Sequence, residues 1–286
     1  MTFLIVLIAL ILEQVLHVGQ FLFRFCCFEQ YINVLRSWFS KLRWWQGYLG
    51  VAIIVVPLLL LVVILFAVFH RVFYHIIYYL ISLLILLYCL GPEDFNARLK
   101  QYFSATEMGN NSAGLEKIRN IIGVGPEMLG SSYRFVTLAI FNKFNENIFA
   151  VLFWFVILGP LGAVLYRTIA LINQHANKVA SPDMTLAMAA RTCQDILDWI
   201  PLRLLGLGYA LVGNFQPTFK YWLANVISEP AKNQQLIEQT GMLALNIDSY
   251  NPEGTLAENK LALDLTERTL IVYLVVLALI TIGMLA

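Results

Sequence analysis

Charged residues are scarce in this sequence of 286 amino acids. Lysine, arginine, aspartate and glutamate together make up 13% of the chain, whereas hydrophobic residues make up 59%. Soluble domains carry about 25% charged residues, so this composition predicts an integral membrane protein. The net charge is only +1, which gives no basis for expecting nucleic-acid binding.

The sequence also lacks the motifs of common metal and nucleotide sites. Its four cysteines, Cys26, Cys27, Cys89 and Cys193, form no Cys-x-x-Cys pair. The glycine-containing stretch at residues 123–130 lacks the Gly-Lys-Ser/Thr of a phosphate-binding loop. We therefore expect no metal ligands and no catalytic residues, and no cofactor beyond Mg²⁺ accompanying a bound nucleotide.

Long apolar runs predict an all-α, polytopic helical membrane protein. Residues 51–69 contain enough apolar residues to cross about 30 Å of hydrocarbon, and 74–90 follow after a very short connection. Thr255 and Glu258 have the spacing of a capping box, so the last helix should begin near residue 256. The predicted spans are about 1–16, 50–69, 74–90, 148–170 and 269–286, with 200–213 as a further candidate.

The distribution of basic residues predicts the orientation of the chain. Residues 13–49 and 91–147 together contain ten lysines and arginines, whereas the hairpin between them contains only Arg71. Cytoplasmic loops are enriched in these residues. We expect one multi-pass domain, residues 1–286, in the cell inner (cytoplasmic) membrane, with cytoplasmic helical segments at 91–147 and 171–268.

Two prolines are expected to interrupt helices. Gly159-Pro160 lies in the middle of the apolar run 148–170, and proline removes a backbone donor. We expect a bent or re-entrant element there, and the alternative is a simple kink in an ordinary span. Pro201 is predicted to end the helix that precedes it.

A small set of polar residues lies beside or within these apolar runs. Ionisable groups at membrane depth are costly and point to functional sites. Arginine can bind carboxylate or phosphate groups through two hydrogen bonds. Each residue also has a structural alternative, such as a helix end at the interface or a solvated helix face. The candidate ligand-binding residues are Glu13, Asn145, Glu146, Arg167, Asp195, Asp198 and Arg203.

Several segments together resemble the AmpE family of inner-membrane proteins. They are LIALILEQ, FAVLFWFVILGPLGAVLYR, LDWIPLRLLGLGYALVGNF and ERTLIVYLVVLALITI. The resemblance implies a signalling modulator of β-lactamase induction, and therefore a protein that is not an enzyme. The expected partners are the lipid bilayer and either an AmpD-type amidase or a metabolite of cell-wall recycling.

A more distant resemblance is to the CobD/CbiB adenosylcobinamide-phosphate synthases. Asp195, Asp198 and Arg203 fall on an Asp-rich, Trp-Ile-Pro-x-Arg segment of that family. Ala170 and Asn173 stand where the synthases have Asn and Asp, and this departure argues against ligase chemistry. A membrane-bound, ATP- and Mg²⁺-dependent ligase and a transporter are the alternatives to a sensor of a small anionic ligand. A transporter would show two related halves, and the sequence shows none.

Overall fold

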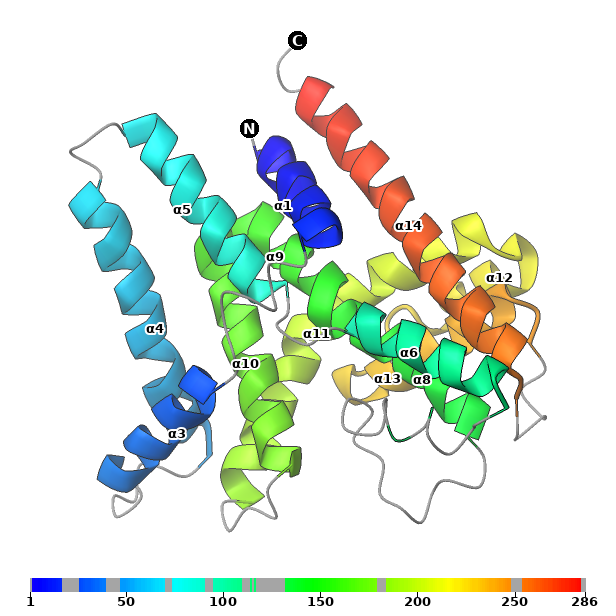
Figure 1. The fold of residues 1–286 in the computed structure, drawn as a ribbon, viewed down its shortest axis with the longest axis horizontal. Helices are drawn as coiled ribbons and strands as arrows, with labels where there is room; N and C mark the ends of the chain where they lie inside the picture. The colour runs from blue at the N-terminus through cyan, green and yellow to red at the C-terminus, as the bar shows by residue number, and fades with distance from the viewer. Residues whose placement is uncertain are drawn as a thin grey trace. The chain divides into compact units, whose positions relative to one another are not determined.

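The described part of the structure, a computed structural model, is helical (Figure 1). It describes residues 2–16, 26–39, 47–69, 74–90, 95–109, 114, 116, 132–178, 184–247 and 254–283. Three helical stretches are long and apolar enough to cross a membrane, namely Gly47–Val68, Tyr133–Leu158 and Leu256–Gly283. The predicted fold class, an all-α membrane protein, is confirmed.

The chain divides into two compact units. The first comprises Met1–Pro92 and Ala150–Leu197, and the second comprises Glu93–Phe149 and Asp198–Ala286. Helices of the first unit are α1 (Thr2–Leu16), α3 (Cys26–Phe39), α4 (Gly47–Phe69), α5 (Tyr74–Cys89), α9 (Ala150–Leu158), α10 (Pro160–Lys178) and the first half of α11 (Met184–Val212).

The second unit contains the remainder of α11 and the helices around it. These are α6 (Phe95–Glu107), α8 (Ser132–Phe144), the π-helical turn η3 (Asn145–Phe149), α12 (Phe215–Asn225), the 3₁₀ turn η4 (Pro230–Lys232), α13 (Asn233–Ala244) and α14 (Leu256–Gly283). Gly241 of α13 lies so close to Phe141 of α8 that a Cβ atom there would be 2.6 Å from the ring. The packing of α8 on α13 therefore requires glycine at this position.

Each unit has its own hydrophobic core. In the first unit, residues of α3, α4, α10 and α11 pack together, including Ile54 and Ile172. In the second unit, α6, α8, α11, α13 and α14 contribute, with Tyr102, Phe141 and Tyr209 fully buried. Large aliphatic residues of α4 and α14 remain exposed, as expected for helices surrounded by lipid.

The bond to the cap side chain that the predicted capping box requires is present at the start of α14. The backbone N–H of Glu258 donates to Thr255 Oγ1 at 3.2 Å. This bond satisfies one of the N–H groups that the first turn of a helix leaves without a partner. Helix α14 begins at Leu256, the residue that follows the cap.

The run 148–170 is broken at Gly159. This residue has a φ angle of 67°, which favours glycine, and it separates α9 from α10. Pro160 occupies the first position of α10, where no N–H donor is needed. A Cβ atom on Gly162 would lie 2.3 Å from the Trp154 carbonyl oxygen, so the two helices meet at a tight corner. Whether this corner lies within the bilayer remains a prediction.

The predicted end of the helix at Pro201 is wrong. Helix α11 continues through Pro201 to Val212. Proline cannot donate the bond that would reach the carbonyl of Leu197, four residues earlier. Instead the indole Nε1 of Trp154 donates to the Leu197 oxygen at 3.2 Å. A side-chain donor thus satisfies the carbonyl that proline leaves unpaired, and the helix persists.

This explanation predicts the outcome of a double-mutant cycle. W154F removes the indole donor and should lower the free energy of unfolding by about 1–3 kcal/mol, the cost of an unsatisfied buried polar group. P201A restores a backbone N–H that can bond to the Leu197 carbonyl, so in that background W154F should cost clearly less. Thermal unfolding in detergent compares wild type, W154F, P201A and the double variant. If W154F lowers the free energy of unfolding equally in the wild-type and P201A backgrounds, the Trp154 indole does not replace the donor that Pro201 lacks.

Candidate functional site

Asn145 and Asp198 form a buried polar pair in the second unit. The Asn145 amide Nδ2 donates to Asp198 Oδ1 at 2.7 Å, although the residues are 53 positions apart. Asn145 is 2% exposed and Asp198 is 7% exposed. The Asn145 oxygen Oδ1 is buried and has no hydrogen-bond partner among the described residues. The pair therefore offers an unused acceptor beside a carboxylate.

A π-helical turn places Asn145 in this position. The turn η3 (Asn145–Phe149) lies between α8 and α9, so the helical ladder changes its register at Asn145. Such π-helical turns occur frequently at functional sites. Glu146, the next residue, instead forms an ion pair with Lys143 at 2.6 Å on the same helix. The structure thus pairs Asn145 with Asp198 and pairs Glu146 locally.

Arg203 is held by neutral groups of the protein on all sides. Its side chain is 4% exposed, and all five N–H groups donate to oxygen atoms. Its guanidinium carbon lies 4.1 Å from the centre of the Trp199 ring. The acceptors are the carbonyl oxygens of Trp199, Val226 and Ser228, the hydroxyl of Ser228 and Oδ1 of Asn233. Arg203 therefore closes the C-terminal end of α12.

Arg167 is the buried cation of the first unit. It lies on α10 and is 4% exposed. The thiol of Cys89, at the end of α5, lies close enough to feel the charge of Arg167. Nearby on α10, the Asn173 amide donates to Gln194 Oε1 at 2.7 Å and so connects α10 to α11.

The first unit contains two other candidate acids, Asp195 and Glu13, and the structure describes the side chain of Asp195 only. Asp195 is half-buried on α11, and burial raises the pKa of its carboxyl group although the charge of Arg191 opposes this. Glu13 belongs to α1, but its side chain lies outside the described part of the structure. Asp195 and Asp198 are three residues apart on α11 and therefore lie on neighbouring positions of one helix face.

Sequence reasoning missed a second buried network, formed by Tyr102, Thr137 and Asn259. Thr137 Oγ1 donates to Asn259 Oδ1 at 2.6 Å, and Asn259 Nδ2 donates to the Tyr102 hydroxyl at 3.0 Å. Burial raises the pKa of Tyr102, which keeps the hydroxyl protonated. The network joins α6, α8 and α14, and the available signal was a polar residue on the apolar face of each helix.

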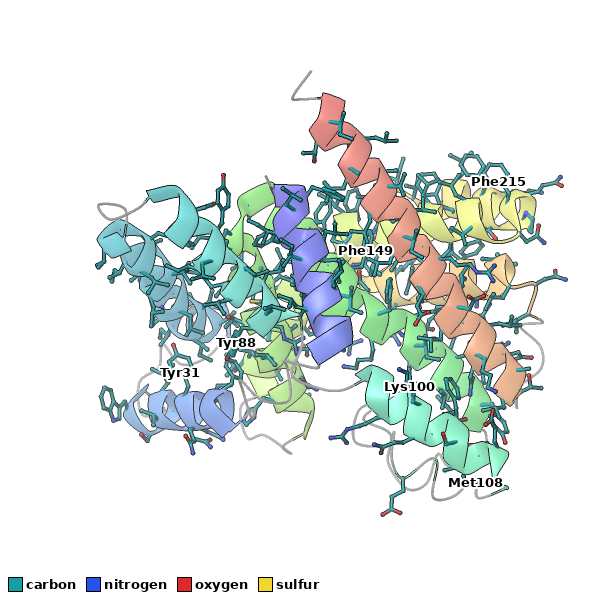
Figure 2. The ribbon with its side chains drawn as sticks, turned by 45° about the horizontal axis from the view of Figure 1, so that its top comes forward. Tyr31, Tyr88, Lys100, Met108, Phe149 and Phe215 are labelled. Atoms are coloured by element: carbon teal, nitrogen blue, oxygen red, sulfur yellow. The ribbon has the colours of Figure 1, made fainter. Side chains whose placement is uncertain are left out.

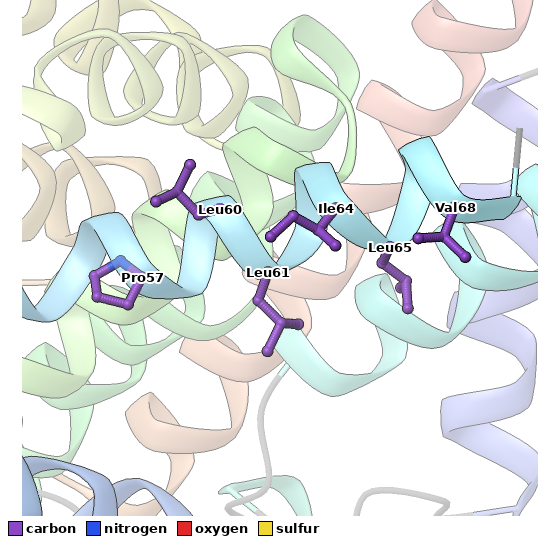
Figure 3. A pocket seen from close by; sticks show the side chains of 6 residues that line it. All are labelled: Pro57, Leu60, Leu61, Ile64, Leu65 and Val68. Atoms are coloured by element: carbon purple, nitrogen blue, oxygen red, sulfur yellow. The ribbon is translucent and has the colours of Figure 1, made fainter.

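A hollow along α4 is lined by apolar side chains alone (Figure 3). Pro57, Leu60, Leu61, Ile64, Leu65 and Val68 line it. All six side chains are apolar, so the hollow offers no group that could fix a charged ligand. In the part of the chain that the structure describes, no three His, Cys, Asp or Glu side chains lie close enough to hold a metal ion.

The helical fold, its candidate spans and its buried polar groups define a polytopic membrane protein. Residues 1–285 match the family described as "Regulatory signalling modulator protein AmpE". The chain therefore belongs to the AmpE family. No solved structure matches the chain.

Three curated proteins are similar to parts of the chain. Protein AmpE of Shigella flexneri is 28% identical over 137 residues, which cover 46% of this chain and 47% of that protein. Cobalamin biosynthesis protein CobD of Stutzerimonas stutzeri is 26% identical over 114 residues, 40% of this chain and 38% of that protein. CobD of Chromobacterium violaceum is 29% identical over 103 residues, which cover 36% of this chain and 33% of that protein. Each similarity thus spans less than half of the relative's length.

The Asn145–Asp198 pair gives a testable expectation about stability. N145A leaves the Asp198 carboxylate buried without its amide donor, so the free energy of unfolding should fall by about 1–3 kcal/mol or more. E146A removes a partly exposed ion pair on one helix and should change it by less than about 1 kcal/mol. Thermal unfolding in detergent compares the two variants. If N145A lowers the free energy of unfolding no more than E146A does, the buried bond contributes no more than the exposed ion pair, and the expectation is wrong.

Proposed function

We propose that this protein is a signalling modulator of the cell inner membrane that couples cell-wall recycling to β-lactamase induction by binding a small anionic ligand. Membership of the AmpE family supports the regulatory role. The buried guanidinium of Arg167 is the observation that carries the ligand proposal. Arginine stays charged inside proteins and binds carboxylate or phosphate groups with two parallel bonds.

The position of Arg167 favours ligand binding over a role at the lipid surface. An arginine that reaches the phospholipid headgroups keeps its charged end exposed. Arg167 is instead 4% exposed on α10. A buried guanidinium can bind a carboxylate or phosphate group through its planar pair of donors. We infer that an anionic group of the ligand binds at Arg167.

The other candidate residues support this function in different ways. Arg203 has all five donors engaged within the protein, so its contribution is to position the end of α12. In the second unit, Asn145 keeps a buried oxygen that has no hydrogen-bond partner among the described residues and can accept a hydrogen bond. Asp195 offers a half-buried carboxyl, and Glu13 is retained from the sequence alone. A cell-wall recycling metabolite combines anionic and hydrogen-bonding groups of this kind.

Complementation of a deletion strain tests the proposal. R167A should abolish induction of β-lactamase, because no other cation replaces the buried guanidinium. R167K keeps the charge but loses the planar pair of donors, so the inducing concentration should rise on the order of tenfold, equivalent to about 1.4 kcal/mol. R268A removes an exposed arginine of α14 and should induce normally.

Immunoblots of the membrane fraction keep this test interpretable. If R167A reaches the wild-type level in the membrane and still supports full induction, Arg167 does not bind the effector. If R268A reaches the wild-type level in the membrane and also fails to support induction, the loss of induction is not specific to the buried cation. D195N/D198N complementation reports on the two acids in the same assay.

The similarity to two CobD proteins supports a second candidate, a membrane-bound ligase. Such an enzyme would use ATP and Mg²⁺ to join an amine to a carboxylate. If the sensor proposal holds, purified protein with Mg²⁺ should show no ATP consumption that depends on added amine and carboxylate. Consumption that requires both substrates and disappears in D195N/D198N would replace the sensor proposal with the ligase.

A further inference from the structure

Helix α12 packs against its own unit along one side only. Thr218 is fully buried, and the indole Nε1 of Trp222 donates to the carbonyl oxygen of Arg203 at 2.8 Å. These two residues are four apart and so lie on the same side of the helix. The opposite side of α12 therefore faces away from the helices of the second unit.

An apolar row runs along the flank of α12 next to its buried side, where the ring of Phe219 stacks on that of Trp222 at 5.7 Å. Phe215, Phe219 and Leu223 are spaced by four residues, and Phe215 and Leu223 are 50% and 58% exposed. The rings of Phe215 and Phe219 are stacked at 5.1 Å with an angle of 11°. Figure 2 shows Phe215 at the beginning of α12, at the edge of the bundle. Leu211, near the end of α11, is also exposed, at 58%.

A polar row lies directly beside the apolar one. Gln216 and Lys220, each one position after a phenylalanine of the apolar row, are both exposed. An apolar row next to a polar row that carries a lysine is the pattern of helices that lie in the interface of a membrane. Lysine at such an edge can place its ammonium group among phosphate headgroups while its stem contacts the acyl chains.

Contacts between α11 and α14 indicate the depth of this helix. The charged residues of α14 end with Glu267 and Arg268, and no charged residue follows to the end of the sequence. A Cβ atom on Gly208 of α11 would lie 2.6 Å from Thr269 and Tyr273 of α14. Helix α11 thus crosses α14 where α14 enters the apolar phase.

The start of α12 lies close to that crossing along the chain. Phe215 follows Gly208 by seven residues, a length of about 10 Å in a helix. The headgroup region on each side of a bilayer is about 5–8 Å thick, beyond a hydrocarbon core of about 30 Å. Phe215 therefore lies within about 10 Å of the level at which α14 enters lipid, near the boundary between lipid and water.

We propose that α12 is an interfacial helix that lies on the lipid surface, with Phe215, Phe219 and Leu223 among the acyl chains and Lys220 among the phosphate headgroups. The occupant of the apolar row is the bilayer, because α14 of the same unit carries this surface into lipid. The role is independent of the anionic ligand proposed above, since α12 contributes none of its candidate residues.

Spin-label accessibility in vesicles tests the proposal. The four native cysteines are replaced by serine or alanine, and single cysteines are introduced at Phe219, Leu223, Lys220 and Val275. Each protein carries a nitroxide and is reconstituted into vesicles of three parts zwitterionic and one part anionic phospholipid. Collision with oxygen, which enters lipid, is compared with collision with a water-soluble nickel chelate. Val275 of α14, 53% exposed, is the control for a residue facing lipid.

The expected result is a contrast between adjacent rows of one helix. The ratio of oxygen to nickel accessibility should be several-fold higher at F219C and L223C than at K220C, and lower than at V275C. Greater access of nickel at F219C and L223C would overturn the proposal by placing the row in water. Protection from both reagents would also overturn it, by showing that protein covers the row. Because the side chain of Leu223 is exposed, L223C decides the outcome if F219C does not fold.

Discussion

The structure depends on the need to satisfy, within the protein, every polar group that the apolar surroundings deprive of water. In a membrane an unpaired backbone carbonyl has no solvent to turn to, and each such group costs several kcal/mol. Helix α11 shows the constraint most clearly. Trp154 reaches the carbonyl that Pro201 leaves open, and Arg203, Trp222 and Tyr273 donate to carbonyls of Trp199, Arg203 and Leu204. The helix persists through its proline because the Trp154 indole supplies the one donor that Pro201 lacks, and the other three side chains add further bonds to carbonyls of the same helix.

The same constraint explains why many buried polar side chains form hydrogen bonds to one another or to the backbone. Arg203 finds five neutral acceptors and one aromatic face, so the charge is spread over dipoles without a carboxylate partner. Tyr102, Thr137 and Asn259 satisfy one another across three helices. The unused oxygen of Asn145 is one of several buried side-chain atoms that have no hydrogen-bond partner among the described residues, and such atoms are where a ligand or a buried water gains most. Asn145 coincides with the π-helical turn, where the backbone also departs from regular geometry.

The sequence was most informative where local chemistry decides the structure. Composition predicted the all-helical membrane class, the capping box predicted the start of α14, and Gly159-Pro160 predicted a helix break. Pro201 misled because its effect depends on a tryptophan 47 residues earlier, which no local pattern reveals. The Asn145–Asp198 bond was equally hidden, since it requires a register change in one helix and the face of another. Arg203 was singled out as a ligand contact, whereas its five bonds to the protein give it a positioning role.

The two positions that depart from the synthase pattern now have a physical role of their own. Ala170 is 1% exposed, so its site on α10 holds a methyl group inside the packed first unit and has no space for a solvated amide. Asn173 uses its amide to donate to Gln194, and a carboxylate at that position could not donate this bond. Asn173 therefore joins α10 to α11 and Ala170 fills a buried position, so both would have to be rebuilt before they could bind a metal ion or a phosphate. This reasoning favours a helical scaffold retained for sensing over a ligase, because Arg167, on the same helix and buried beside them, is the group that still matches an anion.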